Sequence, residues 1–379
     1  MKTRDKILSS AAFAATLVLT ATAASAETKF IANSFYGDQH PLTKYTYTEW
    51  AASLVEISGG DLVPEVYTGS VLLAPRANLQ GAEQNVVQVA NIAAVYTPSD
   101  LPVANAIQEL GFSFADPLAA AFAVTEFSMH NPVQLEEWKA KNLVFLGGYS
   151  TPPYILFCKE PVTTLAEIKG KRIRTSGSSV SKWVESVDAI PVNVPSSEMY
   201  TGLERGTLDC ATNAANDLID RSLWEVAPHT TNLSTGMYWS GPVWGFNQDF
   251  WSSLSTEQRG YIIEASSYAL ANLEVNYVAA TNSALGEAAA KGNTIHEADA
   301  ELTQSANAFR ENAIESAIET ATTDYKITDP AGTINGFVET YKKWETLLES
   351  VDRSDVNAVA ALVKSEIYDA FDPAVYGLN

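Results

Sequence analysis

Residues 165–213 alternate between short apolar strands and segments with helical spacing, and this alternation constrains the fold more than any other part of the sequence. Strands are expected at 171–175, 191–194 and 207–211, and helices at 165–169, 179–187 and 197–205. Gly206 is the residue type that commonly follows the last turn of a helix, so it marks the end of the third helix. Strands and helices that alternate in this way predict an α/β fold with helices on the faces of a sheet.

Two polar residues of this segment stand at strand ends, where they can point into one pocket. Arg174 ends one expected strand, and Asn213 follows another. A planar guanidinium holds a carboxylate by two parallel, charge-assisted hydrogen bonds, which makes Arg174 a candidate ligand anchor. Arg172 has the same strand parity as Arg174, so alternation alone does not choose between the two arginines.

The N-terminal part of the chain shows the same alternation. Strands are expected at 29–33, 61–67, 86–93, 143–148 and 154–158, and helices at 41–58, 75–81, 118–130 and 132–141. Residues 94–116 contain several aromatic residues and prolines, so they are too irregular for one long element but apolar enough to line a cleft. The double proline Pro152-Pro153 indicates a change of lobe.

The C-terminal part is mostly helical. Ser255 and Gln258 have the spacing of a capping box, and the Ala-rich segment behind them stays helical in character to about Lys291. At 1.5 Å per residue, roughly 36 residues span about 54 Å, so this helix is expected to cross two lobes. The other expected elements are an aromatic strand region at 233–246, which returns to the first lobe, and helices at 217–226, 299–320, 334–348 and 355–371.

The length of 379 residues exceeds what one hydrophobic core usually serves, so the chain is expected to form two lobes. Lobe I is assigned residues 27–151 plus 240–279, and lobe II residues 152–239 plus 280–379.

Residues 1–26 have the composition of a secretory signal peptide. Three basic residues within the first six positions precede an apolar run, and Ala24-Ser25-Ala26 gives a small-x-small cleavage pattern. Cleavage after Ala26 would place the mature chain in the periplasm. An uncleaved membrane anchor is the alternative, but the run is short for a bilayer span and rich in Ala and Thr.

Charge and motif content exclude several classes of function. The formal net charge of −21 argues against nucleic acid and anionic membranes as partners. The sequence contains no GxSxG, Walker A or Rossmann motif, and its many carboxylates show no recognisable paired placement. The histidines fit no metal-ligand spacing, since they are widely separated at His40, His130, His229 and His296. We therefore expect no catalytic residues, no metal site and no cofactor.

The cysteines Cys158 and Cys210 each lie in or beside an expected strand of the same region. In an exported chain they could form a disulfide, but neighbouring buried thiols are equally compatible with the pattern.

Two neighbouring segments resemble the solute-binding proteins of tripartite ATP-independent periplasmic (TRAP) transporters. They are TLAEIKGKRIRTSG and, after it, IPVNVPSSEMYTGLERGTLDCATN. Together these segments are similar to the family's strand with arginine, its proline-containing strand, its E-x-Y-x-A-L-x-x-G helix and its V-D-G strand. Gly202 stands at the small residue of that helix motif. The resemblance extends over most of the chain, because it also includes KFIAN near the start, the Gly59-Gly60 corner and WGFNQDFWSSLSTEQR.

The resemblance implies a two-lobed periplasmic binding protein fold with a ligand cleft between lobes, which closes by a hinge on a small organic anion. It implies that Arg174 forks onto a ligand carboxylate, that Asn213 helps to hold it, and that Asn33 contributes from the first lobe. Some members of the family, including those for sialic acid, carry a second arginine where this chain has Tyr154. Recognition by two arginines is therefore in doubt.

Aromatic residues are expected to form the rest of the pocket. An aromatic wall could suit an apolar, ring-bearing or cationic part of a ligand. The residues that could form it are Tyr154, Tyr96, Trp239 and Trp244. The expected function is capture of a small carboxylate, or a sulfonate, for delivery to the integral-membrane TRAP subunits. An ABC-type solute-binding protein and an exported hydrolase are the alternatives, but the arginine strand and the E-x-Y helix favour the TRAP type.

Overall fold

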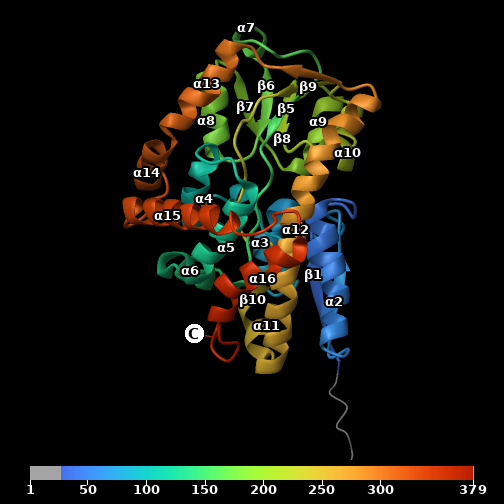
Figure 1. Cartoon of the computed structure of the whole chain (residues 1–379), viewed down its shortest axis with the longest axis vertical. Helices are drawn as coiled ribbons and strands as arrows, with labels where there is room; N and C mark the ends of the chain where they lie inside the picture. Colours follow the sequence, from blue (N-terminus) through green and yellow to red (C-terminus); the bar gives the residue numbers. More distant parts are fainter. Residues whose placement is uncertain (1–26, 379) are drawn as a thin grey trace, which may run out of the picture.

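Two β-sheets, one in each of two lobes, organise the computed structural model, which describes residues 27–378 (Figure 1). The predicted signal peptide at 1–26 lies outside the described residues. Both sheets mix parallel and antiparallel strands, and helices cover them. The predicted α/β class is thereby confirmed.

The sheet of the first lobe has the strand order β2-β1-β3-β10-β4. Strands β1, β2 and β3 are parallel, whereas β10 enters antiparallel between β3 and β4 from a much later part of the chain. The strands are β1 Thr28–Asn33, β2 Leu62–Tyr67, β3 Val89–Ala90, β4 Leu143–Phe145 and β10 Gly245–Asn247. The helices are α1 Pro41–Thr43, α2 Glu49–Ile57, α3 Asn78–Glu83, α4 Pro102–Gln108, α5 Pro117–His130, α6 Pro132–Ala140 and α11 Gln248–Ser253, with a π-helical stretch Lys44–Thr48 between α1 and α2.

The sheet of the second lobe has the order β11-β9-β5-β8-β6-β7. Strand β6 is parallel to both β7 and β8, and β5 is antiparallel to β8 and β9. The strands are β5 Ile155–Cys158, β6 Arg172–Thr175, β7 Ile190–Asn193, β8 Cys210–Asn213, β9 His229–Asn232 and β11 Thr294–Glu297. The helices are α7 Leu165–Ile168, α8 Ser178–Ser186, α9 Met199–Glu204, α10 Asp217–Asp220, α13 Ala300–Glu311 and α14 Ala313–Thr323.

Helix α12, Thr256–Ala290, crosses both lobes as the sequence predicts (Figure 1). Its first turn begins at the predicted capping box, in which Ser255 and Gln258 satisfy each other's backbone N–H groups. Leu270, near its middle, is buried in the core of the first lobe, and Ala284 is buried in a core of the second. The helix is therefore a structural element that the two lobes share.

The C-terminal helices α15, Pro330–Leu348, and α16, Val356–Glu366, pack on the first lobe. Phe337 and Val359 belong to its core, with α15 against α5 and α16 against α12. Residues 280–379 are expected in the second lobe from the sequence; of these, the end of α12 around Ala284, together with α13 and the start of α14, joins cores there. Amphipathic spacing shows that a helix has an apolar face, but it does not show which sheet covers that face.

The segment 233–246, expected as a strand region, forms a strand only from Gly245 onward. The backbone takes a positive φ at Gly236 and Gly241, which interrupts an extended ladder. The backbone N–H of Met237 instead donates to the carbonyl of Gly111, so the segment crosses between lobes through isolated hydrogen bonds. The sequence also did not predict α4 or β11, which are short and lie beside irregular stretches.

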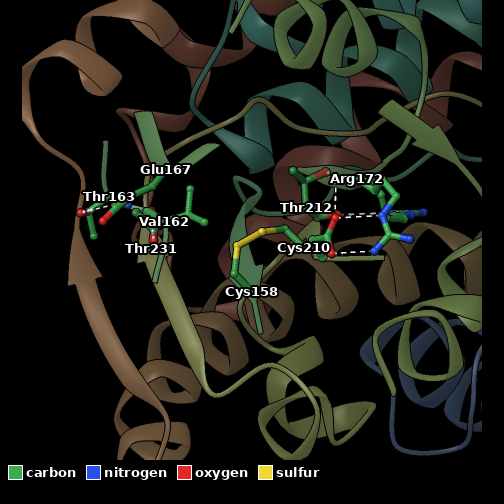
Figure 2. Close-up of a disulfide and its surroundings, with 10 residues drawn as sticks. Cys158, Val162, Thr163, Glu167, Arg172, Cys210, Thr212 and Thr231 are labelled. Carbon is green, nitrogen blue, oxygen red and sulfur yellow. Dashed lines mark hydrogen bonds and ion pairs between the residues drawn. A yellow bond between two sulfur atoms is a disulfide. The ribbon is translucent and has the colours of Figure 1, made fainter. Parts of the chain in front are cut away.

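Cys158 and Cys210 form a disulfide between β5 and β8 (Figure 2). The two residues stand directly opposite each other in the antiparallel ladder, and both are buried. The structure thus decides between the two alternatives that the sequence left open, in favour of the bridge. It joins the strand after the lobe change to the strand that ends at Asn213.

We predict that replacing both cysteines (C158A/C210A) lowers the free energy of unfolding. The bridge closes a loop across a sequence separation of 52 residues, and loss of such a constraint lowers stability by about 2–4 kcal/mol. Urea denaturation of the variant and of the oxidised and reduced parent chain measures this. A variant as stable as the oxidised parent would contradict the prediction.

Candidate functional site

A small, partly enclosed cavity lies between the two lobes. The first lobe contributes Tyr36, His40, Ala93 and Tyr96, and the second lobe contributes Arg174, Ser176, Ser196 and Asn213. The crossing segments supply Thr151, Tyr154 and Tyr238, and helix α12 supplies Tyr277. Since both lobes, the crossing segments and α12 all reach this cavity, relative movement of the lobes would open or close it.

Arg174 lies on β6 and is 1% exposed. Its Nε donates to the carbonyl of Val194 at 3.0 Å, and its Nη1 donates to the carbonyl of Thr212 at 3.0 Å. Its Nη2 lies 3.4 Å from the hydroxyl of Tyr96. These bonds use three of the five N–H donors of a guanidinium, which leaves two for a ligand.

Arg172, the other arginine of β6, has a different environment. It is partly exposed and forms a two-pronged ion pair with Asp209, with Nη2 to Oδ1 at 2.7 Å and Nε to Oδ2 at 2.9 Å. Strand parity did not show whether Arg172 or Arg174 faces the cavity. The ion pair with Asp209 holds Arg172 away from it, so Arg174 is the arginine that lines the cavity.

Asn213 lines the cavity, but its amide is already engaged. Its Nδ2 donates to Asp217 Oδ2 at 2.6 Å, and its Oδ1 accepts the backbone N–H of Ala214 at 3.0 Å. Burial by itself raises the pKa of Asp217, but the charge of Arg221 and a hydrogen bond from His40 lower the pKa, and the lowering effects together outweigh burial. The carboxyl pKa therefore lies below its ordinary value, and Asp217 holds the Asn213 amide as an ionised acceptor.

Tyr96 connects the lobes beside the anchor. Its hydroxyl accepts the backbone N–H of Ser196 at 3.0 Å in addition to its contact with Arg174. Tyr154 forms another part of the wall at the start of the second lobe. Burial raises the pKa of Tyr154 to about 12, although the charge of Arg174 lowers it.

Two of the predicted site residues do not line the cavity. Asn33 is buried, and its Nδ2 donates to Asn78 Oδ1 at 2.6 Å. Trp239 is also buried, with Nε1 donating to the carbonyl of Ile107 and its ring stacked on Phe337 at 5.7 Å between centroids. Both therefore belong to the interior of the first lobe, as does Trp244.

The structure adds cavity residues that the sequence analysis missed. Ser176 and Ser196 follow expected strands, so the strand-end argument that selected Arg174 could have found them. Tyr36 and His40 lie in the break after the first strand, a position that could also have been noted. Tyr277 lies within a long helix, and nothing in its local sequence marks it.

The cavity walls are neutral around one permanent charge. Burial raises the pKa of Tyr36 and Tyr277 well above the ordinary value, so these hydroxyls remain protonated. Arg174 is the only arginine or lysine that lines the cavity, and within residues 27–378 it has no carboxylate in ion-pair contact. The site is thus a buried cation in a polar, uncharged surround, which an anion would neutralise.

Three groups next to the cavity, His40, Asp217 and Asp220, have ligand atoms within 4.8 Å of one another. Arg221 donates from Nε to Asp217 Oδ2 at 2.8 Å, so a guanidinium already occupies the position where a cation would approach that carboxylate. Asp220 accepts from Asn216 at 2.8 Å. Hydrogen bonds and an ion pair therefore join this group to its neighbours.

The two-lobed α/β arrangement, with a buried arginine facing the cavity between the lobes, is the arrangement that the resemblance to solute-binding proteins predicts. Residues 32–320 match the DctP family model, described as bacterial extracellular solute-binding protein, family 7, and the chain belongs to this family. The resemblance to TRAP solute-binding proteins is confirmed, and the ABC-type alternative is not favoured. Within the described residues, no helix combines the length and apolar character that crossing a membrane requires.

The comparisons with individual proteins agree. A solute-binding protein of Albidiferax ferrireducens is 24% identical over 193 residues, which span 50% of this chain and 55% of the relative, so the match covers about half of that relative. A TRAP solute-binding protein of Rhodoferax ferrireducens, solved with copurified benzoate, has a TM-score of 0.74 at 19% identity, covering 85% of this chain and 99% of that one. A marine-metagenome TRAP protein specific for aromatic acids, solved with metahydroxyphenylacetate, has a TM-score of 0.75 at 22% identity, covering 84% and 100%.

Proposed function

We propose that this chain is a TRAP solute receptor that captures a small, ring-bearing monocarboxylate and presents it to integral-membrane transporter subunits. The observation that carries the proposal is the buried guanidinium of Arg174, which has two N–H donors to spare and no carboxylate partner among residues 27–378. The ligand would be bound and released without chemical change.

The charge of the cavity favours a ligand with one negative group. Arg174 offers a single uncompensated positive charge, and Arg221, the next buried arginine, is paired with Asp217. A second carboxylate of a dicarboxylate would be buried among neutral tyrosines, and burial of an unpaired charge is strongly unfavourable. We therefore expect the site to favour monoanions on electrostatic grounds.

The composition of the cavity favours a ring. Tyr36, Tyr96, Tyr154 and Tyr277 supply aromatic faces and neutral hydroxyl groups around it. The benzoate and metahydroxyphenylacetate of the two similar structures are ligands of this type, and they support the same class here.

A thermal-shift series on the chain without its first 26 residues tests the ligand class. We expect benzoate and metahydroxyphenylacetate to raise the melting temperature by several degrees at concentrations far above Kd. Succinate should produce a much smaller shift because of its second charge, and benzenesulfonate tests whether the anchor requires a carboxylate. A larger shift with succinate than with benzoate would contradict the proposal, and conversion of the ligand, seen by mass spectrometry, would favour an enzyme.

Replacing the anchor tests the role of Arg174. We expect Arg174→Ala to weaken binding of the best ligand by about a hundredfold or more, because a charge-assisted, two-pronged contact is lost. Arg174→Lys keeps the charge but not the fork and should recover only part of the affinity. Arg172→Ala is the matched control on the same strand, and its Kd should stay within about twofold of the parent, as measured by calorimetry. Equal loss in the two alanine variants would remove Arg174 from the site.

Export is part of the proposal. We expect the full-length chain, expressed in a Gram-negative host, to appear in the periplasmic fraction with Glu27 as its first residue, because Ala24-Ser25-Ala26 has the small-x-small pattern. N-terminal sequencing of the purified protein measures this. Retention of the first 26 residues on a membrane-bound product would support the anchor alternative.

A further inference from the structure

A buried polar contact joins the two lobes beside the cavity and involves neither Arg174 nor any group available to a ligand. His40, at the start of α1 in the first lobe, is 3% exposed, and Asp217, at the start of α10 in the second lobe, is 1% exposed. His40 Nε2 lies 3.4 Å from Asp217 Oδ1. The two residues belong to different lobes, so the contact exists only while the lobes are together.

The first lobe holds the imidazole of His40 in one orientation. Its Nδ1 accepts the backbone N–H of Leu42 as the cap of α1, which places the ring proton on Nε2, facing Asp217. One face of the ring stacks on Tyr36 at 4.2 Å between centroids, and Tyr277 meets it edge-on at 5.6 Å. Since both ring nitrogens bond to protein, His40 has no polar atom left for a ligand.

The second lobe holds the carboxylate of Asp217 equally firmly. Its Oδ2 accepts from Asn213 Nδ2 at 2.6 Å and from Arg221 Nε at 2.8 Å. Arg221 in turn donates to Ser196 Oγ at 3.1 Å, and its guanidinium lies 5.2 Å from the ring centroid of Tyr36. Asp217 therefore connects two cavity-lining residues of its own lobe, Asn213 and Ser196, to the first lobe.

We propose that His40 and Asp217 are positioning residues that latch the lobes over the bound solute, with Asp217 coupling the latch to the Asn213 side of the cavity. This inference rests on the proposed function, in which the lobes open and close around a ligand. A contact that forms on closure slows opening, so it acts on the dissociation rate of the ligand. It leaves the first encounter with the open cleft unchanged.

Variants at His40 separate a latch from a general structural role. We expect His40→Ala to raise the dissociation rate of benzoate, or of the best ligand of the thermal-shift series, by about tenfold, as for loss of a hydrogen bond to a charged group. The association rate should stay within about twofold. His40→Gln places an amide N–H near the position of Nε2 and should restore most of the slow dissociation. His130→Ala is the matched control, because His130 bonds to a carbonyl of its own helix and does not line the cavity.

A double-mutant cycle with Asp217→Asn tests the coupling. Stopped-flow rates for the single variants and for the H40A/D217N pair should be non-additive, since one contact is removed in each case. The proposal would be overturned by additive effects of the two substitutions on the dissociation rate. It would also be overturned if His40→Gln dissociated as fast as His40→Ala, or if His40→Ala left the dissociation rate unchanged. Should Asp217→Asn not fold, as judged by its melting temperature, the alanine and glutamine variants of His40 still decide the matter.

The outcome is separable from that of the proposed function. If the parent chain binds none of the ring-bearing monocarboxylates, the proposed ligand class fails, and the latch is then tested with whichever solute produces a thermal shift. If the parent binds them and dissociation does not respond to His40, the latch fails while the receptor function stands.

Discussion

The buried guanidinium of Arg174 is the interaction on which the rest of the cavity depends. A permanent charge removed from water is strongly unfavourable unless it is hydrogen-bonded and paired. The carbonyls of Val194 and Thr212 supply part of the replacement for water. Val194 directly follows β7 and Thr212 lies in β8, and both strands neighbour β6. The sheet of the second lobe thus solvates the cation incompletely.

The first lobe encloses this charge and does not neutralise it. Tyr96 reaches across to Arg174 and to the backbone of Ser196, and its hydroxyl carries no charge. The His40 to Asp217 contact provides a second crossing at the cavity, next to the Arg221 ion pair. The contacts between the lobes at the cavity thus leave the charge of Arg174 uncompensated among the described residues.

Local patterns in the sequence predicted a large part of this arrangement. Strand alternation and the family motif selected Arg174, and Asn213, Tyr96 and Tyr154 also line the cavity. Asn33 and Trp239 do not, because their surroundings come from distant segments: Asn78 takes the amide of Asn33, and α15 packs on the ring of Trp239. A strand end or an aromatic residue marks a candidate, but the partner that buries it is encoded elsewhere in the chain.

The sequence by itself determined the α/β class, the capping box and length of α12, and the arginine strand, because each depends on a short-range period or on a residue type at a fixed offset. Tertiary structure showed that Asp209, directly before β8, pairs with Arg172 and leaves Arg174, the arginine that the family motif selected, to face the cavity. It also decided that α15 and α16 cover the first lobe, that the two cysteines are bonded, and that Tyr277 of α12 reaches the solute cavity. These outcomes depend on contacts between residues far apart in sequence, which local periodicity does not encode.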